Sequence, residues 1–291
     1  MSKYINPYTD FGFKKLFGEE ANKDLLLDFL NELLPPQHQI SELTFKNVEQ
    51  YADLKFERKA IFDIHCIAVN GERFIVEMQK AKINFFKDSA LFYTTFPIRD
   101  QAKRKDWDFE LQPVYMVAIL DFLYDATDEK KKFLRHVQLK DQDCDNFYDK
   151  LHFKFIQMPL FTKTEDELVT HFDKWIYFLK KLETFDDIPA ILREPIFEKA
   201  FKVAEVANFT QPQREAYEKS RLGYLEITAA LNTASTDGEK KGKIEGKIEG
   251  KIEVVFEAWK EGYTAQVASK LTKLSLQEIE LLYNQFENES K

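Results

Sequence analysis

The eight residues at positions 113–120, PVYMVAIL, include no charged side chain. A strand with one face in water alternates polar and apolar residues, whereas a strand covered on both faces is apolar throughout. The stretch is also far too short to cross a membrane as a helix. It therefore predicts a strand inside a sheet that has helices packed on both of its faces.

The segments around this strand complete an α/β pattern. Residues 10–34 have apolar side chains at helical spacing, with a break near Gly18. Residues 85–105 favour a second helix, which Pro97 is expected to kink or split. Further segments have the composition of strands, namely 45–54, 61–69, 73–79, 133–139 and 151–161. The order predicts a central mixed sheet flanked by helices.

The composition indicates a folded protein. With 44% hydrophobic residues, the 291-residue chain has ample material for a core. The net charge of -8 argues against a protein that coats nucleic acid by bulk charge, although a local basic strip remains compatible with it. Two cysteines are too few for a disulfide framework. Residues 1–15 lack the apolar segment of a signal peptide, so we expect a cytoplasmic location.

The chain becomes helical after Thr162, and residues 234–242 are small, polar and glycine-containing, which favours a linker. We expect a core of residues 1–162, an α-helical annex of residues 163–234 and a tail of residues 235–291.

The tail begins with a Lys-Ile-Glu-Gly repeat at residues 243–253. On a helix its lysines form one stripe and its glutamates lie roughly opposite, so like charges stack four residues apart. Each glycine costs up to about 1 kcal/mol. We expect either a flexible tether or a helix stabilised by a partner on Ile244, Ile248 and Ile252. Residues 264–282 then resemble a reduced helix-turn-helix whose second helix, starting at Ser275, has no basic side chain for DNA. This favours self-association or a protein partner.

Polar residues interrupt two of the predicted strands. Asp63 stands inside an apolar run, where desolvating a lone carboxylate is costly. Glu77 and Gln79 are two residues apart, so their side chains point to one face of a strand. Converging carboxylates hold Mg²⁺ in phosphodiester hydrolysis. The same pattern also fits a half-exposed hairpin with ordinary polar residues. His65 has the parity to share the face of Asp63 and line such a site.

A local basic strip lies near the end of the helix predicted at residues 85–105. It could contact DNA phosphates, or it could be an ordinary solvated helix end. The strip consists of Arg99, Lys103, Arg104 and Lys105.

Most of the chain resembles the PD-(D/E)XK nuclease superfamily, and within it the Rpn group of recombination-promoting nucleases and transposases. The resemblance lies in DFGFKKLFG at 10–18, residues 22–34, FDI at 62–64, FIVEMQ at 74–79, residues 113–122, and the repeat with the helix pair after it. It implies a restriction-endonuclease-like fold. It also implies a DNA endonuclease that depends on Mg²⁺, with Mn²⁺ as a substitute.

The resemblance also implies roles for single residues. Asp63 and Glu77 would bind the metal, with the backbone carbonyl of Met78 as a further ligand. The superfamily usually has Lys at the third motif position, whereas Gln79 stands here and can orient water or phosphate only through its amide. Asp10 and Gln101 would join the catalytic set. Asp10 equally fits a helix N-cap.

Two classes of function remain open from the sequence. The first is the metal-dependent endonuclease acting on DNA. The second is a catalytically decayed mobile-element protein that keeps the fold and acts as a protein-interaction module. Metal binding at the hairpin would distinguish them.

Two signals conflict over the register of the hairpin. Asn70-Gly71 as a two-residue type I′ turn would put Asp63 on the face opposite to Glu77. A shared metal requires both carboxylates on one face, and hence a three-residue loop at 69–71 or a bulge. We expect such an odd offset; with the three-residue loop, Asp63 would lie directly opposite Glu77. We also expect Glu77 to be partly accessible in a cleft.

Overall fold

The computed structural model describes residues 2–46, 63–82, 84–102, 108–124 and 131–289. The chain divides into two compact units, residues 1–227 and 228–291. The first unit contains the sheet and both sites described below.

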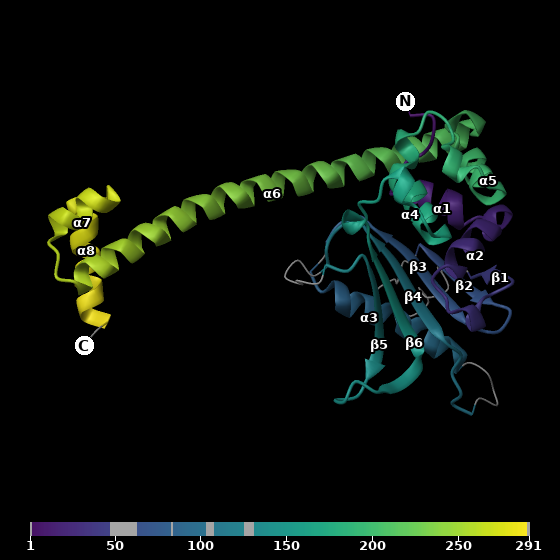
Figure 1. The fold of residues 1–291 in the computed structure, drawn as a ribbon, viewed down its shortest axis with the longest axis horizontal. Coiled ribbons are helices and arrows are strands. Elements are labelled where there is room, and N and C mark those ends of the chain that lie inside the picture. The colour runs from purple at the N-terminus through teal and green to yellow at the C-terminus, as the bar shows by residue number, and fades with distance from the viewer. Residues whose placement is uncertain (1, 47–62, 83, 103–107, 125–130, 290–291) are drawn as a thin grey trace. The chain divides into compact units, whose positions relative to one another are not determined.

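Within the described ranges, six strands form one mixed sheet in the order β1-β2-β3-β4-β6-β5 (Figure 1). The pairs β3–β4 and β4–β6 are parallel, and the other pairs are antiparallel. The strands are β1 (Leu43–Phe45), β2 (Ile64–Ala68), β3 (Arg73–Gln79), β4 (Val114–Leu120), β5 (Leu134–Lys140) and β6 (Asn146–Gln157). All residues of β4 are buried, which confirms the prediction of a strand inside the sheet.

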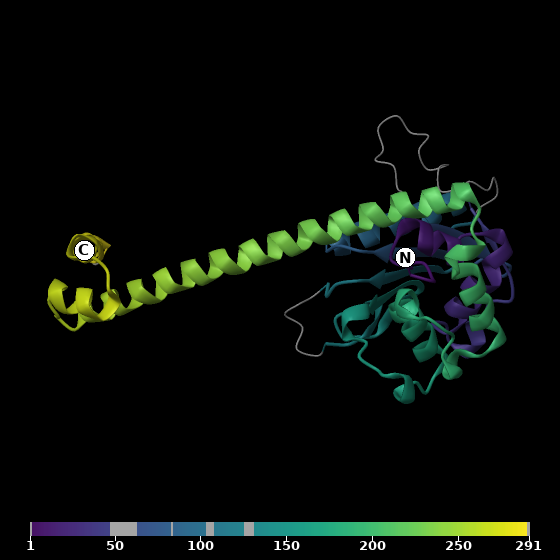
Figure 2. The ribbon, with the colours of Figure 1, turned by 90° about the horizontal axis from the view of Figure 1, so that it is seen from above.

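Different helices cover the two faces of the sheet, as Figures 1 and 2 show. Alternate residues of β3 and β4 pack in two separate clusters, because successive side chains of a strand point to opposite faces. On one face lie α1 (Asp10–Phe17), α2 (Lys23–Asn31), α4 (His171–Lys181) and α5 (Pro195–Ala204). On the other lies α3 (Phe86–Gln101). The predicted mixed sheet with helices on both faces is therefore confirmed.

Several predicted boundaries move. The helix α3 is continuous through Pro97, so the proline does not split it. Of the strand predicted at 45–54, residues 47–54 lie outside the described ranges, and β1 ends at Phe45. The strand predicted at 61–69 begins at Ile64. Short 3-10 turns connect the main elements, among them η2 (Pro36–His38) after α2.

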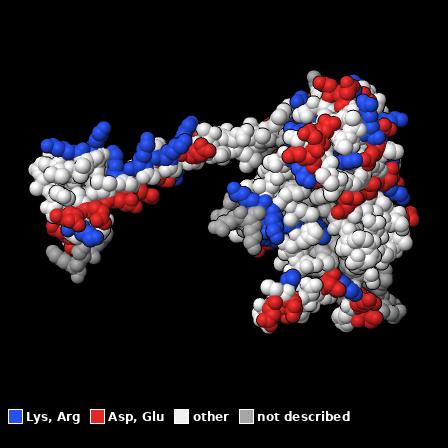
Figure 3. All heavy atoms as spheres, viewed as in Figure 1, with Lys and Arg blue, Asp and Glu red and all other residues white. Residues whose placement is uncertain are grey.

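The helix α6 (Gln211–Lys260) is continuous over residues 234–242, so the segment predicted as a linker is helical. The division into a core, an annex and a tail stays a prediction. The repeat is likewise helical rather than a tether. Alanine, threonine, glutamate and lysine in this segment are compatible with a helix, and a single glycine costs only about 1 kcal/mol. Figure 3 shows basic side chains along one side of the repeat and acidic side chains along the other.

The second unit has its own small core. The end of α6 packs there with α7 (Ala265–Thr272) and α8 (Leu276–Glu289). A capping box starts α8, because Ser275 N donates to Glu278 Oε2 and Glu278 N donates to Ser275 Oγ. Among the helices that the structure describes, none is long and apolar enough to cross a membrane. The cytoplasmic location stays a prediction.

Candidate metal centre

A loop of three residues, Val69–Gly71, joins β2 to β3. Ala68 and Glu72, the residues that flank the loop, are joined by a hydrogen bond of 2.9 Å from Ala68 N to Glu72 O. Gly71 has a φ of 92°, a conformation that glycine adopts without steric cost. The tight Asn-Gly turn is therefore not formed, and of the two alternatives the structure has the three-residue loop.

This loop sets the register that brings two carboxylates together. Ile64 lies opposite Val76, so the next residue outward, Asp63, comes opposite Glu77. Asp63 Oδ2 accepts a hydrogen bond of 2.8 Å from Met78 N. The odd offset is thus confirmed, and the face that Asp63 and Glu77 share is the one that α3 covers.

Glu77 is buried, with 3% of its surface exposed. Burial raises its pKa most and the charge of Asp63 adds to the shift, while a 2.8 Å hydrogen bond from Gln79 Nε2 opposes it; together they bring the pKa to about 8. The expectation of a partly accessible Glu77 is wrong. The strand β3 that carries Glu77 lies between β2 and β4. On the α3 side, Tyr93 lies near both carboxylates: burial raises the pKa of the Tyr93 hydroxyl most, and the charges of Glu77 and Asp63 raise it as well.

Asp63 is less enclosed and sits among other charges. Burial raises its pKa, whereas the Met78 N–H, Lys14 and Lys80 lower it and Asp10 raises it. Lys14 and Asp10, both on α1, form an ion pair of 2.8 Å. Lys80 is half-buried, which lowers its pKa, while Asp10 and Asp63 raise it.

Asp10 does not cap its helix. Thr9 Oγ1 accepts a 3.0 Å hydrogen bond from Gly12 N and is the N-cap of α1, so that explanation of Asp10 is wrong. The structure places Asp10 near Asp63 instead. Lys14, Lys80 and Tyr93 were not identified from the sequence. Lys80 directly follows the Glu-Met-Gln segment, and this adjacency is a signal that could have found it.

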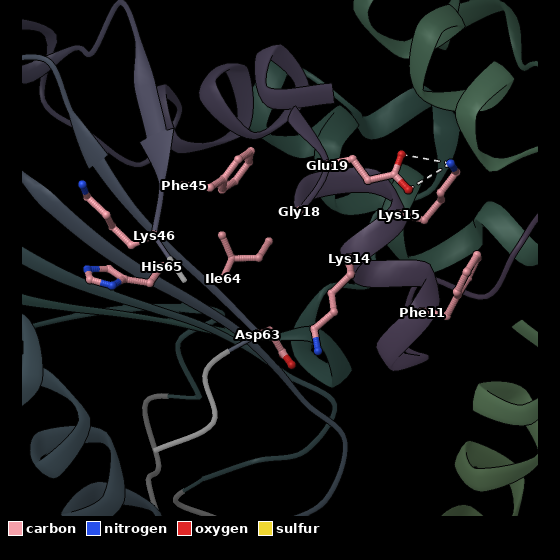
Figure 4. A pocket seen from close by; sticks show the side chains of 10 residues that line it. All are labelled: Phe11, Lys14, Lys15, Gly18, Glu19, Phe45, Lys46, Asp63, Ile64 and His65. Atoms are coloured by element: carbon pink, nitrogen blue, oxygen red, sulfur yellow. Dashed lines mark hydrogen bonds and ion pairs between the residues drawn. The ribbon is translucent and has the colours of Figure 1, made fainter. Parts of the chain in front are cut away.

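A pocket of about 330 Å³ opens beside Asp63. Figure 4 shows Lys14 reaching from α1 toward Asp63, with Lys46 and His65 on the other wall. His65 therefore lines the pocket as expected. Burial and the charge of Arg73 lower its pKa to about 4, so its imidazole is neutral at pH 7.

Gln101 lies elsewhere. Its Oε1 accepts from Gln112 N at 2.7 Å and its Nε2 donates to Gln112 O at 3.3 Å, which fixes the chain before β4. Glu77 lies opposite Ala118 of β4. Ala118 is six residues beyond Gln112 (112 to 118), which is roughly 20 Å along the strand. The structure therefore does not bring Gln101 to the carboxylates.

The basic strip is described only in part. Arg99 is exposed near the end of α3, with its guanidinium 5.3 Å from the centre of the Phe96 ring. Lys103, Arg104 and Lys105 lie outside the described residues.

The donor set at the hairpin consists of oxygen atoms. In the part of the chain that the structure describes, no three His, Cys, Asp or Glu side chains converge as metal ligands. Asp121 N donates to Gln79 O on the β4 side. Because backbone groups alternate along a strand, the carbonyl of Met78 faces the side of Asp63. Two carboxylates and a carbonyl suit a hard cation such as Mg²⁺ or Mn²⁺, and a cation there would offset the buried negative charge.

The comparison with protein families gives one match. The model described as "PD-(D/E)XK nuclease family transposase" matches residues 7–234, which include all six strands and the carboxylate pair. No curated protein and no solved structure matches the chain.

Proposed function

Because the chain belongs to the PD-(D/E)XK nuclease family transposases and has a restriction-endonuclease-like α/β fold, we propose that it is a metal-dependent DNA endonuclease. The observation that supports this most is the pairing of Asp63 with Glu77 across the hairpin. Two carboxylates held together in a buried place raise the free energy of the fold unless a cation or protons neutralise them.

Asp63, Glu77 and the carbonyl of Met78 would hold the ion. Bound Mg²⁺ would supply a Lewis acid that polarises the phosphate and lowers the pKa of water. Mn²⁺ would replace it, since both ions prefer oxygen ligands.

The protein's own groups orient this set. The Met78 N–H fixes one oxygen of Asp63, and the Gln79 amide fixes one oxygen of Glu77. Gln79 Nε2 is engaged with Glu77, which leaves its Oε1 as an acceptor for a water proton. Gln79 is therefore a positioning residue for Glu77 and for the attacking water.

Lysines near the pair would provide the positive charge that Gln79 lacks. Lys14 and Lys80 both act electrostatically on Asp63. A cation beside the carboxylates stabilises the negative charge that develops on a phosphate during cleavage. We assign this role to Lys80 first, because it is half-buried beside the motif and its charge is less screened.

One observation favours the second class of function, a decayed protein that serves as an interaction module. Glu77 is 3% exposed and holds a proton at neutral pH when its pKa is about 8. A site closed in this way would not bind metal. Metal binding at neutral pH therefore separates the two functions.

The test is cleavage of supercoiled plasmid by the full chain with Mg²⁺. The wild type should nick and linearise the plasmid, and Asp63→Asn should lower the rate at least about 100-fold. Glu226→Gln, which removes an exposed carboxylate on α6, is the matched control and should cleave normally. Absence of both cleavage and Mn²⁺ binding in the wild type would establish the decayed protein.

A further inference from the structure

A second pocket, of about 550 Å³, lies in the first unit on the face of the sheet opposite to the metal centre. Tyr115 of β4 and His152 and Lys154 of β6 line it. Tyr115 belongs to the cluster packed under α1 and α2, whereas Glu77 points to the α3 face. The pocket is therefore separate from the metal centre.

Lys154 is the unusual residue of this pocket, because it is a buried cation next to a neutral partner. It is 7% exposed. Its Nζ lies 3.2 Å from His136 Nδ1, and burial lowers its pKa. No carboxylate of the described residues pairs with it. An ammonium buried without a counter-ion costs free energy.

Other enclosed lysines of the first unit do have compensating partners. Lys15 pairs with Glu19 at 2.9 Å, and Lys180 donates to the carbonyls of Met158 and Phe161. The fold therefore generally supplies acceptors to its lysines. Lys154 is an exception that faces a pocket.

The geometry of the pair fixes the tautomer of His136. An ammonium can only donate, so Nδ1 of His136 accepts and its Nε2 carries the proton. Burial and the charge of Lys154 lower the pKa of His136, which keeps the ring neutral. Lys154 and His136 together thus offer N–H donors and no negative charge.

The remaining lining has two kinds of surface. Its apolar wall comes from Leu33, Leu34, Pro35 and Pro113. Its other titratable groups are Glu32, His38, Asp149, Lys150 and His152. His152 is stacked on Tyr115 with ring centres 4.6 Å apart, and Lys150 is 3.5 Å from Glu110. The histidines do not form a metal site, since no such group exists within the described ranges.

We propose that this pocket binds a small phosphate monoester, with its anionic group on Lys154 and His136 and its body against the apolar wall. A phosphate dianion accepts several hydrogen bonds at once, and it supplies the counter-charge that Lys154 lacks. A volume of about 550 Å³ accommodates a molecule up to the size of a mononucleotide.

The experiment follows the imidazole resonances of the metal-free full chain by NMR while inorganic phosphate or adenosine monophosphate is added. Both probes should shift the resonances of His136 and His152 saturably, and adenosine monophosphate should bind more tightly because its ring packs on the apolar wall. Lys154→Gln should weaken both affinities at least about tenfold. Lys202→Gln, which removes an exposed lysine of α5, should change neither.

Stability provides a second readout. Lys154→Met removes the charge and keeps the bulk, so in ligand-free buffer it should unfold at a higher temperature than the wild type. Phosphate should raise the unfolding temperature of the wild type and leave that of Lys154→Met unchanged.

Each of three results would overturn the proposal. The first is the absence of saturable shifts with either probe. The second is equal affinity in wild type and Lys154→Gln, or equal affinity for the two probes. The third is a response of His136 to a DNA duplex but to neither small molecule, which would make the pocket part of a nucleic-acid surface.

Discussion

The metal centre and the Lys154 pocket are built on one sheet, and their most buried ionisable groups are of opposite kinds. Asp63 and Glu77 place carboxyl groups on the α3 face, and Lys154 places an amine on the other face. In each case the nearest hydrogen-bond partner of the most buried group is neutral, an amide for Glu77 and an imidazole for Lys154. The alternation of strand side chains keeps the two charges apart, so neither site neutralises the other.

The largest expected effect is on the negative side of this comparison. Glu77→Gln should lower plasmid cleavage at least about 100-fold and abolish Mn²⁺ binding, because one metal ligand is lost. The same change should stabilise the metal-free fold above about pH 8, where Glu77 is ionised and the substitution removes a buried charge. Parallel measurements of cleavage rate, Mn²⁺ affinity and urea unfolding check this. A Glu77→Gln protein that cleaves at the wild-type rate would contradict the assigned centre.

The pH dependence of stability should differ in sign between the two sites. Glu77 has a pKa of about 8 in the fold against 4.5 for a free side chain, so between these values the folded state binds more protons. The free energy of unfolding of the metal-free chain should therefore fall as pH rises from about 4.5 to about 8. Urea titrations across this range check it, and the fall should be smaller in Glu77→Gln, where other carboxyl groups with a raised pKa, such as Asp63, still contribute.

For Lys154 the sign is reversed. The pKa of Lys154 is lowered in the fold from 10.5. Between its pKa in the folded state and its pKa in the unfolded state, the unfolded chain binds more protons, so the contribution of Lys154 to the free energy of unfolding rises with pH. Unfolding measured at alkaline pH should show a larger rise in the wild type than in Lys154→Met, where other lysines with a lowered pKa, such as Lys180, still contribute. A rise of the same size in both proteins would indicate other groups.

A smaller effect is expected for the lysine beside the motif. Lys80→Gln should lower kcat/KM for plasmid cleavage about tenfold while Mn²⁺ still binds, because charge on the phosphate loses a neighbouring cation. Lys82→Gln, two residues further on and exposed, is the control. Equal rates for both variants would assign the cationic role elsewhere.

The smallest effect on catalysis is expected at Gln101. Gln101→Ala should lower the free energy of unfolding by about 1–3 kcal/mol, because it leaves the backbone of Gln112 without its partner. Cleavage should be unchanged. A large loss of kcat/KM in a stable Gln101→Ala protein would show that the residue acts in the reaction.

The sequence predicted those features that depend on neighbouring residues or on one pair of strands. The apolar run at residues 113–120 predicted that β4 lies inside the sheet. The requirement that both metal ligands share one face predicted the register of the hairpin. Features that join distant segments were not predictable in this way. Lys14 reaches Asp63 from α1, and His136 meets Lys154 across β5 and β6, and neither contact leaves a local pattern. Gln101 was predicted to join the catalytic set, but its position on α3 does not show which end of the sheet its side chain reaches. In the structure that side chain bonds the backbone of Gln112, before β4.

The hairpin loop has a consequence for the order of folding. Val69 favours strands and is nevertheless 72% exposed in the loop, where its N–H donates to Glu42 O beside β1 at 3.2 Å. We expect the docking of β1 to strengthen the observed register, and this docking is a longer-range event than hairpin closure. An excised peptide of the two strands should therefore populate the two-residue Asn-Gly turn more often than the whole chain does, and with it the register that separates the carboxylates. In that case competence for chemistry depends on the assembled sheet as well as on the segment that carries the motif.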